Sequence, residues 1–153
     1  MKKLLKIKIN SIIKPKIEFV EYPVLETKFE IINKMISKLN ENNSKILKYL
    51  SKELALSKIR EYKIKIIKNG HEKEDIIKIL KVWLTRIRVR RLVFIVFEGI
   101  ILPFTPILAI LPGPNVFFYI PALLIYFHFK TFISLNNLKF KDLDIEWEDD
   151  LNS

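Results

Sequence analysis

The fold that the sequence predicts is decided by residues 92–129, which read LVFIVFEGIILPFTPILAILPGPNVFFYIPALLIYFHF. Glu98 is the only formally charged residue in this stretch, and His128 is the only other titratable group besides two tyrosines. Leu111-Pro112-Gly113-Pro114-Asn115 divides the stretch into two segments. Each segment is long enough to cross a ~30 Å hydrocarbon core as a helix of about 20 residues. We therefore expect a two-helix membrane hairpin, transmembrane or re-entrant, with a Pro-Gly-Pro turn at residues 112–114.

The remainder of the chain is expected to be mainly helical. Residues 4–9 and 16–22 alternate apolar and polar side chains, which predicts short strands or an extended arm over residues 1–23. From Val24 the apolar residues recur every three or four positions, which is typical of helices, and this spacing continues through Ile66. A further helix begins near Glu72 and should run without a break into the hairpin. The predicted parts are thus an arm (1–23), a cytoplasmic helical region (24–91), a membrane hairpin (92–135) and an acidic tail (136–153).

The charges predict how the hairpin is oriented. The 153-residue chain has a formal net charge of +10, and six of its 17 acidic residues follow Lys141. Just before the hairpin stands a basic cluster that includes Arg86, Arg88, Arg90 and Arg91. The positive-inside rule then places both ends of the hairpin on the cytoplasmic or matrix side, and the arginines are candidates for binding anionic lipid headgroups. No sequence motif supports nucleic-acid binding, so nucleic acid is an unlikely partner.

Glu98 and His128 are the candidates for proton-linked chemistry. They lie at nearly equal distances from the turn, so an antiparallel hairpin places them at about the same depth. Burial disfavours a charged carboxylate, and a Glu–His pair can pass a proton. The alternative is that Glu98 reaches the interface or makes one hydrogen bond. Thr105 is a third candidate, because Pro103, Pro106 and Pro121 free backbone carbonyls that need a donor.

Signals of other functions are absent from the sequence. There is no cysteine, no nucleophile motif and no phosphate-binding glycine loop, so we expect neither an enzyme nor a bound cofactor. His71 and Asp75 have a metal-chelating spacing, but without a second nearby histidine a solvated helix start is the simpler interpretation. We therefore expect no metal site.

The centre of the hairpin sequence resembles the signature of the mitochondrial K+–H+ exchange-related family. The resemblance covers roughly Leu102 to Leu138 and includes His128-Phe129-Lys130. Its other residues are Pro103, Pro106, Pro112, Gly113, Pro114, Asn115, Phe117, Phe118 and Tyr119. The resemblance implies involvement in potassium–proton exchange, more as an accessory to that process than as a proven carrier. The chain shows no Arg/Ser-rich transit peptide, so a bacterial cell membrane and the mitochondrial inner membrane are both expected locations.

Three hypotheses follow from the sequence. The first is a membrane protein involved in, or accessory to, monovalent cation (K+)/proton exchange, in contact with the lipid bilayer and with a second copy or a partner membrane protein. The second is a non-transporting membrane scaffold whose basic helical region binds a partner or anionic lipid. The third is a soluble helical protein that buries residues 92–129 as its core.

Overall fold

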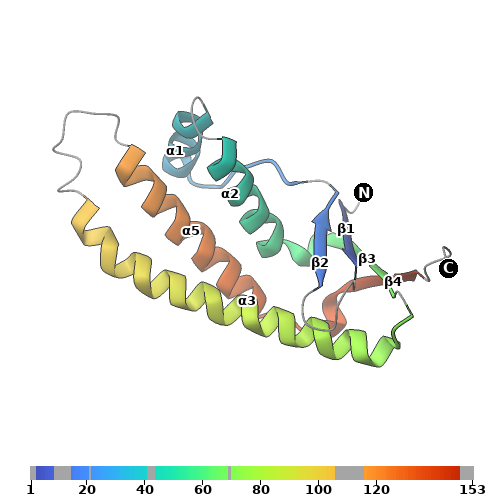
Figure 1. Ribbon diagram of the computed structural model, residues 1–153. Helices are drawn as coiled ribbons and strands as arrows, with labels where there is room; N and C mark the ends of the chain where they lie inside the picture. The colour runs from blue at the N-terminus through green and yellow to red at the C-terminus, as the bar shows by residue number, and fades with distance from the viewer. Residues whose placement is uncertain are drawn as a thin grey trace.

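A computed structural model of the chain describes residues 3–8, 15–20, 22–40, 44–68, 70–105 and 116–148. Figure 1 shows a small sheet at one end, from which a group of helices extends. In chain order the elements are β1 (Lys3–Lys8), β2 (Lys16–Phe19), α1 (Glu30–Asn40), α2 (Ser44–Ser57), η1 (Ile59–Glu61), β3 (Tyr62–Ile67), α3 (Lys73–Ile101), η2 (Leu102–Phe104), α5 (Val116–Asn136), η3 (Phe140–Asp142) and β4 (Asp144–Glu148).

The sheet has the strand order β2-β1-β3-β4. β1 pairs antiparallel with β2 and parallel with β3, and β3 pairs parallel with β4. The two parallel pairings need long connections, which the helices provide. α1 and α2 lie between β2 and β3 in the sequence, and α3 and α5 lie between β3 and β4. The predicted arm is therefore part of a mixed sheet that also takes in two later segments.

The predicted continuation of the helical pattern through Ile66 is wrong, because residues 62–67 form β3. Tyr62, Ile64 and Ile66 are buried while Lys63 is exposed, which is the alternation of a strand with one covered face. The same residues also fit a three- and four-residue spacing when Ile59 is included. Pairing with β1 on one side and β4 on the other selects the strand.

The acidic segment after Lys141 supplies the last strand of the sheet. Ile145 pairs with Ile64 across the β3–β4 register. Carboxylates of β4 form ion pairs with lysines of β3. Nζ of Lys63 lies 3.2 Å from a carboxylate oxygen of Glu146, and Nζ of Lys65 lies 2.8 Å from one of Glu148. The charge imbalance that suggested a separate tail therefore reflects cross-strand pairing between a basic strand and an acidic one.

The mainly helical fold class is confirmed, and α3 runs unbroken from the sheet into the apolar stretch as expected. One core lies between the sheet, the end of α2 and the first half of α3, and it includes Leu5, Ile64 and Leu80. A second core joins α1, α2 and α5 around Leu54 and Phe127. The two cores together hold the sheet and the helices in one unit.

α3 and α5 pack side by side as an antiparallel pair (Figure 1). No helix in the described part of the chain is both long and apolar enough to cross a membrane, so the predicted transmembrane hairpin is not supported. α3 ends at Ile101, and its apolar part from Leu92 covers only about 15 Å of a ~30 Å hydrocarbon core. In α5, His128 and Lys130 interrupt the apolar sequence. The predicted turn at residues 112–114 lies outside the described residues.

The two described glycines in and near α3 give a matched pair of stability predictions. Gly70 has φ +77° just before the helix, whereas Gly99 is helical, and an added Cβ would meet nothing within 4 Å at either position. Gly70→Ala should lower the free energy of unfolding by about 1 kcal/mol through backbone strain alone. Gly99→Ala should raise it by about 0.5–1 kcal/mol, because alanine loses less entropy in a helix. Urea denaturation of both variants checks these signs, and a loss of stability in Gly99→Ala would contradict the second.

Candidate functional site

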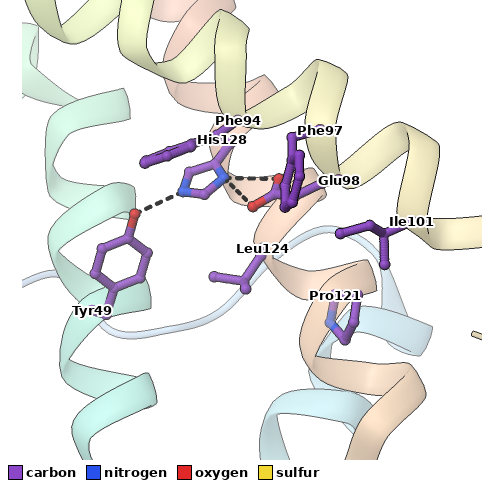
Figure 2. A pocket seen from close by; sticks show the side chains of 8 residues that line it. All are labelled: Tyr49, Phe94, Phe97, Glu98, Ile101, Pro121, Leu124 and His128. Carbon is purple, nitrogen blue, oxygen red and sulfur yellow. Dashed lines mark hydrogen bonds and ion pairs between the residues drawn. The ribbon is translucent and has the colours of Figure 1, made fainter.

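The candidate site lies where α2, α3 and α5 meet. Each helix contributes one polar side chain to the contact: Tyr49 from α2, Glu98 from α3 and His128 from α5 (Figure 2). His128 is 2% exposed. The structure thus brings together the two residues singled out from the sequence and adds a tyrosine that the sequence reasoning missed.

The three side chains form one hydrogen-bonded chain. Nδ1 of His128 lies 2.8 Å from one carboxylate oxygen of Glu98 and 2.9 Å from the other, and Nε2 lies 2.7 Å from the hydroxyl oxygen of Tyr49. When Nδ1 carries the proton, it donates to the Glu98 carboxylate and Nε2 accepts from the tyrosine. When Glu98 is protonated, its hydroxyl can donate to Nδ1 instead, and Nε2–H then donates to the tyrosine oxygen. Both proton arrangements use the same heavy-atom positions.

Burial sets the protonation of all three groups. Desolvation raises the pKa of Glu98 to about 7, with nearby Arg91 acting in the opposite direction. Desolvation lowers the pKa of His128 to about 4 and raises that of Tyr49 to about 12. Near neutral pH the histidine and the tyrosine are therefore uncharged. The Glu98 carboxyl is the group of the three that gains and loses a proton there.

A pocket of about 470 Å³ opens beside this chain. Figure 2 shows the side chains that line it: Tyr49, Phe94, Phe97, Glu98, Ile101, Pro121, Leu124 and His128. Most of these are apolar, and the Phe94 ring lies 5.3 Å from the His128 ring, centroid to centroid. The apolar walls exclude water from around the carboxyl, which is the physical cause of its raised pKa.

A buried ion pair lies on the same three helices, nearer the sheet. Arg91 donates to both carboxylate oxygens of Glu53, with Nε 2.8 Å from Oε2, and the two residues are 8% and 1% exposed. Thr131 donates to the backbone carbonyl of Glu53 at 2.9 Å. Arg91 therefore points into the protein, in contrast to its predicted role at lipid headgroups. Arg86 and Arg90 are exposed and Arg88 is half-buried, so these three remain candidates for that role.

The other predicted site residues are spread over the structure. Thr105 is buried, away from the pocket, and its hydroxyl donates to the Leu102 carbonyl at 2.7 Å. The backbone N–H of Thr105 donates to the same carbonyl, so the threonine satisfies it twice. Tyr119 accepts a hydrogen bond from Lys38 of α1 at 3.1 Å, and Lys130 is half-buried above the Tyr126 ring. Pro106, Pro112, Gly113, Pro114 and Asn115 lie outside the described residues, and Phe117 and Phe118 are described only as part of α5.

The sequence did carry a signal for the residues that the reasoning missed. In α2, Glu53 stands between Leu50 and Leu54 on the apolar face of an amphipathic helix, and Tyr49 is one turn before it. In α3, Arg91 and Glu98 are two turns apart on one face. An acid on a buried helical face needs a cation as a partner. The described residues contain no cluster of three acids or histidines that could hold a metal ion, so a basic side chain is the partner to look for.

Residues 2–141 match the family model described as mitochondrial K+-H+ exchange-related. The chain belongs to this family. The match extends the resemblance from the hairpin to the sheet, since β1, β2 and β3 all fall within it. No curated protein and no solved structure matches the chain.

Proposed function

We propose that this member of the K+–H+ exchange-related family is an accessory protein of cation–proton exchange that handles protons at Glu98 while bound to an anionic membrane surface. The observation that carries the proposal is the hydrogen-bonded chain from Glu98 through His128 to Tyr49, in which burial raises the pKa of Glu98 to about 7. A group with this pKa changes charge over a physiological pH range.

The geometry supports a simple proton movement. A proton taken up by Glu98 can pass to Nδ1 of His128 while Nε2 gives its own proton to the Tyr49 oxygen and the half-buried Tyr49 hydroxyl releases its proton to water. The ring then holds one proton, as before, and the carboxylate is ready for another. The 2.7 Å contact with Tyr49 fixes the ring orientation that this exchange requires. A neutral ring at rest, with its pKa near 4, can take the proton only transiently.

An accessory role fits the pocket better than that of a carrier. Potassium is bound in proteins by several oxygen atoms that replace its hydration shell. Among the described residues that line this pocket, the only side-chain oxygens are those of Glu98 and Tyr49, and the other side chains are apolar apart from the imidazole ring. The same carboxyl is well suited to bind a proton, because proton binding needs one oxygen atom.

The outer surface of α3 supports binding to a bilayer. We define the apolar surface as the exposed side chains Val93, Val96, Phe97, Ile100 and Phe104, which are 58–63% exposed. The arginine group Arg86, Arg88 and Arg90 precedes it on the same helix without an intervening acid. An apolar surface bordered by cations complements a membrane with anionic headgroups. Because β1 and β4 share one sheet, both ends of the chain are expected on the same side of that membrane.

Removing the arginine group should weaken vesicle binding strongly. Near an anionic surface each basic residue contributes about 1 kcal/mol, so the triple change of Arg86, Arg88 and Arg90 to Gln should lower the affinity by about 100-fold. The measurement is co-sedimentation with vesicles containing phosphatidylserine. The control is the triple change of Lys45, Lys48 and Lys52 to Gln on α2, which removes the same charge from exposed positions. An equal loss of vesicle affinity in both triple variants would contradict the proposal that the arginine group is the part that binds the membrane.

The proton role is tested by Glu98→Gln in membranes from the source cells. Deletion of the gene should lower K+-driven proton flux in membrane vesicles, and the wild-type chain should restore it. Glu98→Gln, which is nearly isosteric but cannot ionise, should restore less than half of the flux, while Gly99→Ala serves as the neighbouring control. Flux that is unchanged by deletion would overturn the proposal.

The second candidate function is a membrane scaffold that moves no proton, and the apolar surface favours it equally. The two functions predict that different substitutions change the effect of the chain on proton flux. If Phe97→Ser and Ile100→Ser abolish the effect of the chain on flux and Glu98→Gln does not, the scaffold replaces the proton-handling role.

A further inference from the structure

A second pocket lies beside the sheet, and none of the residues of the apolar surface lines it. Its volume is about 580 Å³, which is within the usual range for small-molecule sites. Lys3 and Tyr62, the first residues of β1 and β3, belong to its walls, and α5 contributes Lys130. Segments far apart in the sequence thus meet around one cavity.

The walls of this pocket are strongly basic. Lys3, Lys28, Lys58 and Lys130 line it, against two glutamates, which leaves a net charge of +2. Lys3, Lys58 and Lys130 are half-buried, and only Lys28 is fully exposed. Lysines are rarely buried unless a negative group accompanies them. Four lysines, three of them half-buried, therefore line one cavity.

The protein itself supplies little compensation for these charges. Lys28, Lys58 and Lys130 form no ion pair with a carboxylate in the described ranges. Lys130 lies 5.9 Å from the Tyr126 ring centroid, which is a weak contact. Burial lowers the pKa of Lys130 and repulsion from Lys58 lowers it further, while attraction to Glu61 acts in the opposite direction. A bound anion would relieve both effects.

We propose that this pocket binds a soluble phosphate monoester whose organic part is about the size of a nucleoside. Two or three converging ammonium groups provide the charge-assisted donors that a phosphate dianion takes up. The volume exceeds that of phosphate alone, and Val24, which is 76% exposed, offers an apolar contact for an organic part. No residue of the apolar surface or of the arginine group lines the pocket, which favours a soluble ester over a lipid headgroup.

Calorimetric titration with AMP, adenosine and inorganic phosphate at about 0.15 M salt tests the inference. The wild-type chain should bind AMP at least 10-fold more tightly than adenosine. Lys58→Gln and Lys130→Gln should each weaken AMP binding by about 10-fold, the usual effect of removing one charged hydrogen-bond donor. Lys28→Gln, at an exposed position, gives a third variant in case the half-buried substitutions impair folding. Lys45→Gln and Lys48→Gln on α2 are matched controls that should bind as the wild type does.

Three results would overturn the inference: no saturable binding of AMP, equal affinity for adenosine, or an equal loss in the α2 controls. Vesicles containing phosphatidic acid separate the two sources of the phosphate group. Weakened vesicle binding by Lys58→Gln, without AMP binding to the wild type, would assign the pocket to a lipid headgroup and overturn the soluble ester. The inference does not depend on the proposed function, because neither lysine belongs to the apolar surface or the arginine group.

Discussion

Glu53→Ala is expected to lower the free energy of unfolding by about 3–5 kcal/mol, enough to unfold much of the protein at 37 °C. Arg91 is 8% exposed, and the substitution removes both hydrogen bonds that its guanidinium donates to the Glu53 carboxylate. A buried charge without a partner keeps the free-energy cost of desolvation but loses the ion pair that compensated for it. Urea denaturation at pH 7 measures the effect.

The double change Glu53→Leu with Arg91→Met is the matched control. It removes both charges and keeps similar volume, so it should recover most of the stability lost in Glu53→Ala. A loss below about 1 kcal/mol in the single variant would mean that water reaches Arg91 in solution. A double variant as unstable as the single one would mean that Glu53 acts by packing and not by charge.

The second large effect is a pH dependence that appears only when one member of the Glu98–His128 pair is removed. The pKa of Glu98 is raised from 4.5 to about 7, so this group stabilises the fold below pH 4.5 and loses that contribution as the pH rises through 7. The pKa of His128 is lowered from 6.5 to about 4, so its contribution is present above pH 6.5 and is lost as the pH falls toward 4. Between about pH 4.5 and 6.5 the contribution of Glu98 to stability falls with pH while that of His128 rises, so the two changes oppose each other.

Each single variant should therefore show the pH dependence of stability that comes from the one remaining group. In Glu98→Gln the stability relative to the wild type should rise with pH from 4.5 to 6.5, because only His128 titrates. In His128→Gln the stability relative to the wild type should fall with pH from 4.5 to 6.5, because only Glu98 titrates. One proton gives at most about 1.4 kcal/mol per pH unit. Urea midpoints at several pH values measure both slopes, and parallel curves for all three proteins would contradict the raised and lowered pKa values.

Much of the helical part of this fold could be predicted from local patterns. The absence of glycine and proline between Asp75 and Phe97 predicted one continuous helix, and α3 spans that whole range. The proximity of Glu98 and His128 followed from their equal distances from the turn sequence. Such predictions succeed because the spacing of side chains along a helix depends only on neighbours within a few turns.

The sheet and the inward-facing charges could not be predicted in this way. Residues 62–67 fit both a helical and a strand period, and only β1 and β4, far away in the sequence, select the strand. Arg91 belongs to a run of arginines that look alike in the sequence. It is turned inward by Glu53, 38 positions earlier on another helix.

Residue pattern alone is enough to establish the helical character of the chain, its family, and the one carboxyl and one imidazole that lie within its most apolar stretch. The packing of this stretch against α1 and α2, and the place of Tyr49 at the end of the hydrogen-bonded chain, follow from contacts between segments far apart in the sequence. The physical reason is the range of the interactions. Helical periodicity and apolar content are local properties, whereas burial, charge pairing and pKa depend on which distant segments share the same interior.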